Sequence, residues 1–165
     1  MVIGIGGCSR SGKTTLANDL VWHFRNQNQQ AMVLRQDDFV KRVKDIPLIR
    51  DEIDWECPAS IDFELLKEAI TFFRTRFEVV IVEGILVFAD SSLNTLFDRT
   101  FFVEISEATF RTRKAADTRW SKIPDWFVTH IWQSYQRYGL PPAHLPNMSH
   151  VSGEVKFEIN AILTH

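Results

Sequence analysis

Short apolar runs alternate along this chain with longer stretches in which apolar residues recur every three or four positions. Runs of the first kind predict buried strands, and stretches of the second kind predict helices that pack on them. We expect strands at 2–6, 31–35, 77–82, 99–105 and 147–151. We expect helices at 14–27, from Ser60 onward, at 107–119, at 124–138 and at 152–163. This alternation predicts an α/β fold, a parallel sheet with helices on both faces.

Local signals refine three of these helices and one connection. Ser60 is placed to cap the second helix, whose inward side chains are expected to be Phe63, Leu66, Ile70 and Phe73. Pro124 suits the first turn of its helix. The last helix is expected to carry along one side Val155, Ile159 and Ile162. Residues 41–59, with two prolines and many charges, are expected to be irregular.

Composition narrows the class of protein. The chain has 165 residues, enough for one domain spanning 1–165, and 45% of them are hydrophobic. Its net charge of −2 argues against binding nucleic acid through phosphate neutralisation. Two cysteines do not make a disulfide scaffold, and no apolar run is long enough to span a membrane. With no signal peptide in the N-terminal residues, we expect a cytoplasmic protein that binds neither membrane nor nucleic acid.

A phosphate-binding loop follows the first predicted strand. Residues 7–14 read Gly-Cys-Ser-Arg-Ser-Gly-Lys-Thr and match the motif G-x-x-x-x-G-K-[ST] between a strand and a helix. Backbone N–H groups of such a loop, with the helix N-terminus, cradle phosphate. Lys13 is expected to reach the β- and γ-phosphates, and the Thr14 hydroxyl to ligate Mg²⁺. The expected phosphate-binding residues of the loop are Gly7, Ser9, Ser11, Gly12, Lys13, Thr14 and Thr15. Cys8 is interpreted as a space-filling residue.

Carboxylates follow the next two strands of the predicted sheet. Asp37 and Asp38 come after the second strand, and Glu83 ends the third. Ligands of parallel α/β sheets bind beyond the carboxyl ends of the strands, so these groups are expected near the phosphate loop. One carboxylate there can take a proton from an acceptor hydroxyl, and another can hold a metal ion. Adjacent side chains of an extended chain point oppositely, so we assign Asp37 to the site and leave Asp38 as the weaker candidate.

Basic residues cluster in the segment at about 107–123, which we interpret as a short helical lid. Arg111 and Arg119 would lie about 80° apart on a helix, with Arg113 pointing away from both, so only some of them can reach one phosphate group. Arginines on a lid can stabilise charge on a transferring phosphoryl group. We assign Arg113 and Arg119 to the phosphates. The alternative is an ordinary charged helix face.

The tryptophans and histidines are interpreted from their surroundings. Tryptophans in predicted helices are expected to pack against the protein: Trp22, Trp126 and Trp132. Trp55, beside Asp54, and Trp120, at the end of the lid, are the two candidates to stack on a flat ring of the substrate. Histidines in predicted helices have no metal-ligand spacing and are interpreted as structural: His23 and His130.

Several of these stretches together resemble one enzyme family. The phosphate loop, Gln-Asp-Asp-Phe at 36–39, Asp-Trp-Glu at 54–56 with Pro58, Ile-Val-Glu-Gly at 81–84 and His-Ile-Trp at 130–132 occur in that order. The chain thereby resembles the uridine kinase and nicotinamide riboside kinase group of P-loop kinases, and nicotinamide riboside kinases most. The resemblance implies the P-loop NTPase fold with a five-stranded parallel sheet, and phosphorylation of a nucleoside 5′-hydroxyl by ATP and Mg²⁺.

The resemblance also implies roles for single residues. Asp37 would be the catalytic base, acting with Lys13, and Glu83 would act at the Mg²⁺ site. Asp54 would hold the ribose hydroxyls, and Trp120 would stack on a nicotinamide ring. We take Thr14, Glu83 and Asp37 as the metal candidates, and Asp37, Asp54, Trp55 and Trp120 as the substrate-binding candidates.

Three functions stay open at this point. The first is ATP-dependent phosphorylation of nicotinamide riboside, which would place the chain in NAD salvage. The second is a uridine or cytidine kinase, which would need hydrogen-bond partners for the exocyclic groups of a pyrimidine. The third is a regulatory NTPase, although the chain has no Asn-Lys-x-Asp segment for reading guanine. We expect small-molecule partners, a nucleoside and ATP, and a monomer or small homo-oligomer.

Overall fold

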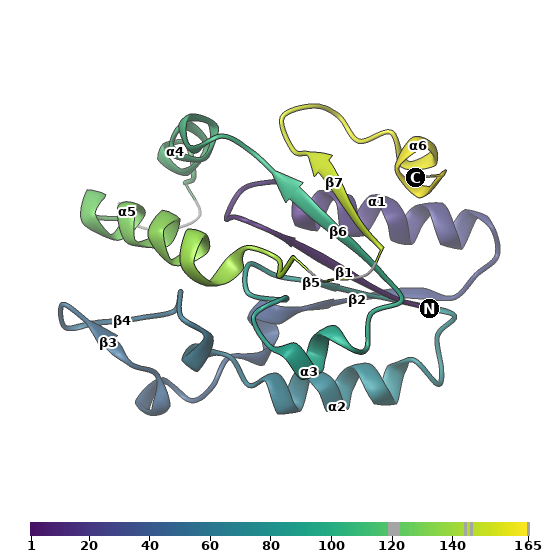
Figure 1. Cartoon of the computed structure of the whole chain (residues 1–165), viewed down its shortest axis with the longest axis horizontal. Helices are drawn as coiled ribbons and strands as arrows, with labels where there is room; N and C mark the ends of the chain where they lie inside the picture. The colour runs from purple at the N-terminus through teal and green to yellow at the C-terminus, as the bar shows by residue number, and fades with distance from the viewer. Residues whose placement is uncertain (119–122, 144, 146, 165) are drawn as a thin grey trace.

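A five-stranded parallel sheet forms the centre of the molecule (Figure 1). The computed structural model describes residues 1–118, 123–143, 145 and 147–164. The sheet order is β2-β5-β1-β6-β7, and each neighbouring pair is parallel. The strands are β1 (Val2–Gly7), β2 (Ala31–Arg35), β5 (Val79–Glu83), β6 (Arg99–Glu104) and β7 (Met148–Ser152). All five expected strands are confirmed, with ends that differ by a residue or two.

The strand register brings the ends of the central strands to one edge. In the parallel ladders Ile5 lies beside Glu83, Arg35 beside Glu83, and Gly7 beside Val103. Every residue of β1 and β5 is buried, because helices cover both faces of these strands. The first phosphate-loop residue and the carboxylate of Glu83 therefore emerge at the same edge of the sheet.

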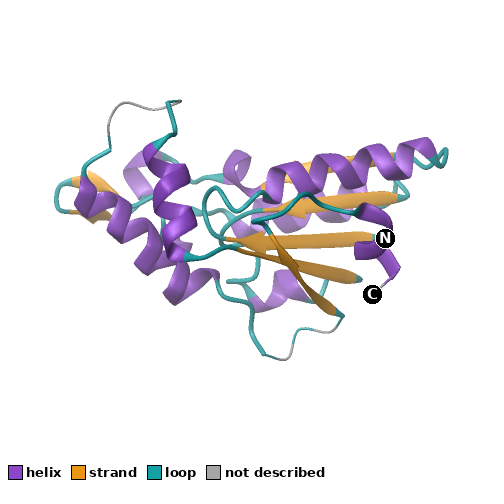
Figure 2. Ribbon diagram, turned by 90° about the horizontal axis from the view of Figure 1, so that it is seen from above, coloured by secondary structure: helices purple, strands orange, loops and turns teal. Residues whose placement is uncertain are grey.

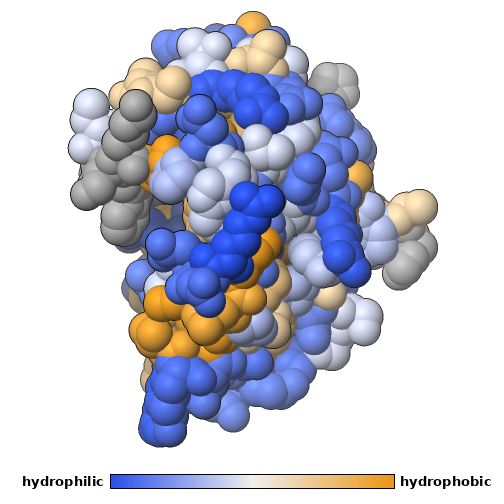
Figure 3. All heavy atoms as spheres, turned by 90° about the vertical axis from the view of Figure 1, so that its left-hand side faces the viewer, coloured by the Kyte–Doolittle hydropathy of each residue, from blue (hydrophilic) through white to orange (hydrophobic). Residues whose placement is uncertain are grey.

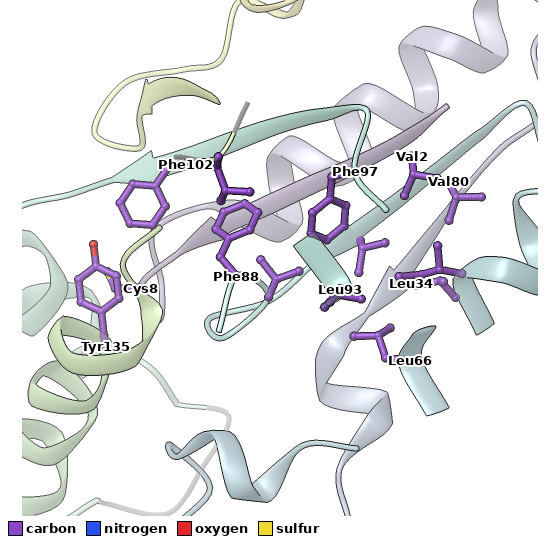
Figure 4. Packing of buried hydrophobic residues seen from close by; sticks show 14 of the residues in the cluster. Val2, Cys8, Leu34, Leu66, Val80, Phe88, Leu93, Phe97, Phe102 and Tyr135 are labelled. Carbon is purple, nitrogen blue, oxygen red and sulfur yellow. The ribbon is translucent and has the colours of Figure 1, made fainter. Parts of the chain in front are cut away.

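Helices cover the two faces and leave a separate core under each (Figure 2). One face carries α1 (Lys13–Asn26) and α6 (Ile159–Thr164). The other carries α2 (Phe63–Phe73) and α3 (Ser91–Asn94), and α5 (Asp125–Ser134) packs at its carboxyl-edge end. This second core runs from Val2 and Val80 to Phe102 and Tyr135 beside Cys8 (Figure 4). Cys8 is 1% exposed, as expected of a space-filling residue.

Helix ends correct several sequence expectations. The cap of α2 is Asp62, whose side chain accepts from the Leu65 amide. Ser60 is instead the buried last residue of a 3-10 turn (Pro58–Ser60). The inward residues of α2 are confirmed, with Leu66 and Ile70 fully buried. The helix α4 (Glu107–Ala115) stops before the expected end. Pro124 precedes α5 as its cap, and that helix continues into a π-helical turn (Tyr135–Gly139).

The expected helix at 152–163 is wrong in its first half. Only α6, from Ile159, is helical, because residues 153–158 cross over the phosphate loop first. Gly153 lies against the Ser11 carbonyl so closely that a Cβ atom would overlap it. Ile159 and Ile162 pack on the core as expected, but Val155 is 67% exposed.

Residues 41–59 are more ordered than their composition predicts. They contain a short hairpin, β3 (Leu48–Ile49) with β4 (Glu52–Ile53), and a 3-10 turn (Val43–Asp45). The two residues between the strands have left-handed φ angles of 47° and 63°, which suits a two-residue hairpin turn. An apolar area lies at this end of the molecule (Figure 3), where Val43 and Leu48 are among the exposed apolar side chains.

Tryptophan packing follows the sequence expectation only in part. Trp126 and Trp132 are partly buried, whereas Trp22 on α1 is 63% exposed, so its expected packing is wrong. Within the described chain, the helices are all too short or too polar to cross a membrane.

Candidate active site

The phosphate loop turns sharply between β1 and α1. Gly7 and Gly12 have φ angles of 143° and 107°, a region that favours glycine. A Cβ atom at Gly7 would also overlap the Val103 carbonyl of the neighbouring strand. The Ser11 amide donates to the Cys8 carbonyl at 3.2 Å and closes the loop. The glycine pattern of the motif thus has a steric cause in this chain.

Lys13 lies buried at the start of α1. Its Nζ donates to the Cys8 carbonyl oxygen at 2.8 Å. Burial lowers the pKa of Lys13, and the carboxylate of Glu83 is the largest opposing influence. An ammonium group has three N–H donors, so Lys13 can keep the loop contact and still donate to phosphate oxygens.

Thr14 and Glu83 meet across two elements. The Thr14 hydroxyl donates to Glu83 Oε1 at 2.9 Å, which joins the start of α1 to the end of β5. Glu83 is 6% exposed, and burial raises its pKa, while Lys13 and the Thr14 hydrogen bond act in the opposite direction. A hydroxyl and a carboxylate held this close are oxygen ligands of the kind Mg²⁺ prefers.

Asp37 reaches the same place by a different local structure from the one expected. The Asp pair does not extend β2 but lies in a 3-10 turn (Gln36–Phe39). Gln36 fixes this turn, because its Oε1 accepts from the Leu86 amide at 3.0 Å and its side chain packs against Gly84. Both aspartates are exposed, and of the two only Asp37 is among the described residues that line the cleft.

One cleft of about 400 Å³ gathers these groups. The described residues that line it are Ser9, Arg10, Gly12, Lys13, Thr14, Asp37, Glu83, Gly84, Ile85 and Arg113. Three expected loop residues lie apart from this lining. The Ser11 hydroxyl is buried beneath the loop beside Gly7, Gly7 itself is buried, and Thr15 is exposed on α1. Their expected contacts with phosphate stay predictions.

Arg113 is the lid residue that the structure brings to the cleft. Its guanidinium donates to the Arg10 carbonyl at 3.1 Å and to the Gly153 carbonyl at 2.9 Å. Arg111 faces elsewhere and pairs with Glu107 at 2.7 Å on the exposed side of α4. Arg119 and Trp120 lie outside the described residues. Arg10 was missed by the sequence reasoning because it occupies a variable position of the motif.

Asp54, the residue predicted to hold the ribose hydroxyls, is not among the described residues that line the cleft, and its role stays a prediction. Asp54 Oδ1 accepts from the Glu56 amide at 3.1 Å and lies 2.8 Å from His130 Nε2. Trp55 is 40% exposed and is not among the described cleft residues. Its contact with substrate stays a prediction.

Glu56 is a second residue that the sequence reasoning missed. Its side chain is partly buried, and burial raises its pKa to about 7, with Asp37 adding to the rise and Lys114 opposing it. The charge of the candidate base Asp37 thus acts on Glu56. The available signal was its place in Asp-Trp-Glu at 54–56, where acidic residues flank an aromatic one. Such acidic residues need partners or a ligand when they are partly buried.

Comparisons with known proteins place the chain among kinases. Nicotinamide riboside kinase 1 of Homo sapiens is 28% identical over 156 residues, covering 83% of this chain and 75% of the relative. A uridine kinase of Leuconostoc citreum is 31% identical over 132 residues, 65% of this chain and 63% of the relative. No family model matches the sequence.

Solved structures share the fold at lower identity. A sugar kinase from Janibacter has a TM-score of 0.64 at 14% identity, with 99% of this chain and 92% of that chain covered. A protein described as a possible uridine kinase from Bacillus stearothermophilus has a TM-score of 0.59 at 19% identity, with coverage of 90% and 87%.

The fold, the phosphate loop and these relatives define a P-loop kinase, an enzyme that transfers a phosphoryl group. Its phosphoryl donor is ATP. Among known proteins, the chain is similar to nicotinamide riboside kinases and to a uridine kinase.

Proposed function

We propose that the chain transfers the γ-phosphoryl group of ATP to the 5′-hydroxyl of nicotinamide riboside and so forms nicotinamide mononucleotide. The observation that carries this proposal is the shared cleft, in which the carboxylate of Asp37 faces the phosphate loop with Lys13 and Thr14. A phosphate cradle and a carboxylate that line one cleft suit phosphoryl transfer to an alcohol. The nicotinamide riboside kinase relatives support the choice of acceptor.

The phosphates of ATP are bound by the loop in this proposal. Amides at the start of α1 and the ammonium of Lys13 face the β- and γ-phosphates. Arg113 keeps its two carbonyl contacts and offers its remaining N–H groups to the phosphates. Arg119 is proposed as a further phosphate contact from the lid.

Mg²⁺ fits the oxygen groups on this side of the cleft. The described chain offers no cluster of three or more His, Cys, Asp or Glu side chains for a metal ion. This agrees with Mg²⁺, which in kinases is held by one or two protein oxygens with water and substrate phosphates. Thr14, Glu83 and Asp37 would hold it, directly or through water. When bound, the ion neutralises charge on the phosphates.

Asp37 acts on the acceptor. Its carboxylate orients the 5′-hydroxyl and accepts the proton as the oxygen attacks the γ-phosphorus. Asp54 uses Oδ1 for its two protein contacts, and we assign Oδ2 to the ribose hydroxyls. Trp55 and Trp120 are proposed to contact the nicotinamide ring. A cationic pyridinium ring is favoured near the carboxylate of Asp37.

The experiment is ADP release from MgATP with nicotinamide riboside, uridine, cytidine or adenosine, and with no acceptor. We expect turnover with nicotinamide riboside and at most slow turnover with the other nucleosides. Chelating Mg²⁺ with EDTA should abolish it, and added Mg²⁺ should restore it. Turnover with no added acceptor would overturn the kinase proposal in favour of a regulatory NTPase.

A uridine or cytidine kinase is the second candidate, and the uridine kinase relative at 31% identity supports it. Turnover confined to uridine or cytidine would establish this function and keep the same phosphate chemistry. The set of nucleosides tested therefore distinguishes a nicotinamide riboside kinase from a uridine or cytidine kinase.

A further inference from the structure

The segment 46–57 is fastened to helix α5 at two points. At its base, His130 Nε2 lies 2.8 Å from Asp54 Oδ1, and the two side chains are 14% and 15% exposed. At its tip, the Arg50 guanidinium stacks 4.9 Å above the centre of the Trp126 ring. Both partners of the segment, His130 and Trp126, belong to α5.

Asp54 controls the path of the chain around it. Its amide donates to the Pro47 carbonyl at 2.8 Å, and its carbonyl accepts from Cys57 Sγ at 3.4 Å. Its carboxylate also accepts from the Glu56 amide, which turns the chain at that residue. A hydrogen bond to a carboxylate is among the stronger kinds in proteins. The orientation of Asp54 therefore fixes the backbone at Glu56.

Hydrogen bonds continue from this segment to the turn of Asp37. The Ser60 hydroxyl lies 2.9 Å from the Trp55 carbonyl and 2.7 Å from the Cys57 carbonyl. The Ser60 carbonyl accepts from the Lys41 amide, and the Asp62 amide donates to the Phe39 carbonyl, both at 2.8 Å. Contacts thus run without a break from α5 through Asp54 to the turn that carries the candidate base.

We propose that His130 is a positioning residue for the acceptor, which it places by holding Asp54 and, through Asp54, Glu56. This inference rests on the proposed function. The ring of His130 also contacts the edge of Phe127 and lies 3.5 Å from the Ser134 hydroxyl, both on its own helix. On the segment, His130 contacts the carboxylate of Asp54. A histidine that only filled space would need no such hydrogen-bond partner.

The first test compares two substitutions of His130. His130→Ala removes the contact, and we expect KM for nicotinamide riboside to rise about tenfold, while KM for ATP changes less than twofold. His130→Gln keeps an N–H donor at similar reach and should recover most of the loss. His23→Ala is the control, because His23 contacts Gln27 on the exposed side of α1. In an Asp54→Asn background, His130→Ala should add little, because the two residues act through one contact.

The second test does not depend on the acceptor. The Glu56 amide should exchange with deuterium at least fivefold faster in His130→Ala than in the unchanged chain and in His130→Gln. An unchanged exchange rate would overturn the inference, as would equal rises in both KM values with a lowered Tm. If the unchanged chain phosphorylates no nucleoside, the proposed function fails, and the exchange rates still decide whether His130 holds the segment.

Discussion

At the scale of single residues, the site separates phosphate contacts from acceptor chemistry. Lys13 and Thr14 are fixed by the loop and by Glu83. The turn of Asp37 is held separately, because its Gln36 side chain accepts from the Leu86 amide. Each functional group therefore has its own support. Substitutions should accordingly affect one half of the reaction at a time.

Asp37→Ala should lower kcat by about 10²–10⁴-fold, because the acceptor loses its proton acceptor. The Kd for ATP should stay within about threefold of the unchanged value, since the loop contacts do not involve Asp37. Asp38→Ala is the matched control in the same turn and should stay near the unchanged kcat. Steady-state kinetics with an ATP-binding titration checks both. A near-normal kcat in Asp37→Ala would remove this residue from the mechanism.

Lys13→Met keeps the length of the side chain and removes its charge. We expect kcat/KM for ATP to fall by at least about 10²-fold, because the ammonium that faces the β- and γ-phosphates is lost. The variant should fold, since burial already disfavours the charge of Lys13. Initial rates over a range of ATP concentrations measure this, and an unchanged kcat/KM would contradict the assignment of the loop.

Glu56 should make stability depend on pH. Burial raises its pKa from 4.5 to about 7, so between these values the folded chain keeps a proton that the unfolded chain has lost. The free energy of unfolding therefore falls as pH rises through this window. Glu56→Gln removes this titration. Its free energy of unfolding, relative to that of the unchanged chain, should therefore rise by about 1–2 kcal/mol from pH 5 to pH 8.

Urea unfolding at the two pH values measures the effect of Glu56. Glu52→Gln, on the exposed β4 strand of the same segment, is the control. A difference between Glu56→Gln and the unchanged chain that is the same at both pH values would show that Glu56 does not bind this proton.

At the scale of elements, the sequence predicted best where burial alone decides the structure. The strands β1 and β5 are buried along their whole length, so an apolar run was a sufficient signal. The sequence also predicted that four residues lie together at the carboxyl edge of the sheet: Lys13, Thr14, Asp37 and Glu83. It could not predict that Asp37 sits in a 3-10 turn, because the Gln36 contact with Leu86 joins residues far apart in the chain.

The helix expected at 152–163 failed for a similar reason. Its apolar spacing is helical, yet Gly153 must pass against the Ser11 carbonyl, and the Glu154 carboxylate accepts from the amide of Ser106, the cap residue of α4. These distant contacts hold the chain extended until α6 begins. A local pattern carries no information about them. The contact of His130 with Asp54 is equally unpredictable, because it joins residues 76 apart in the chain.

Gly153→Ala should disturb the phosphate loop from outside. The added methyl group would overlap the Ser11 carbonyl and press on Val103 and Ile105. We expect a loss of about 1–3 kcal/mol in the free energy of unfolding and a raised KM for ATP. Lys156→Ala, an exposed residue of the same segment, is the control for both. An unchanged KM for ATP would separate this segment from the loop.

At the scale of the whole molecule, the cleft of the candidate site lies at one edge of a sheet that has a core on each face. Elements from both cores meet there, because α1 belongs to one and the turn after α5 to the other. Binding at this edge should therefore stabilise the entire domain.

MgATP at about 100 times its Kd should add about 2.7 kcal/mol to the free energy of unfolding, which corresponds to a rise in Tm of about 5–10 °C. EDTA should reduce this rise in Tm, and MgATP should raise the Tm of Lys13→Met only slightly. Thermal unfolding followed by circular dichroism measures these shifts. A Tm that does not respond to MgATP would argue against binding at this edge.

The segment 46–57 has a consequence for how this kind of enzyme can diverge. Its shape is maintained by local hydrogen bonds and by α5, and its hairpin is a separate two-stranded sheet that adds no strand to the central one. Mutations there can accumulate without altering the strands that carry the phosphate loop. Descendants of one ancestral kinase can thus acquire new acceptors by exchanging this single stretch, while the transfer machinery is inherited intact.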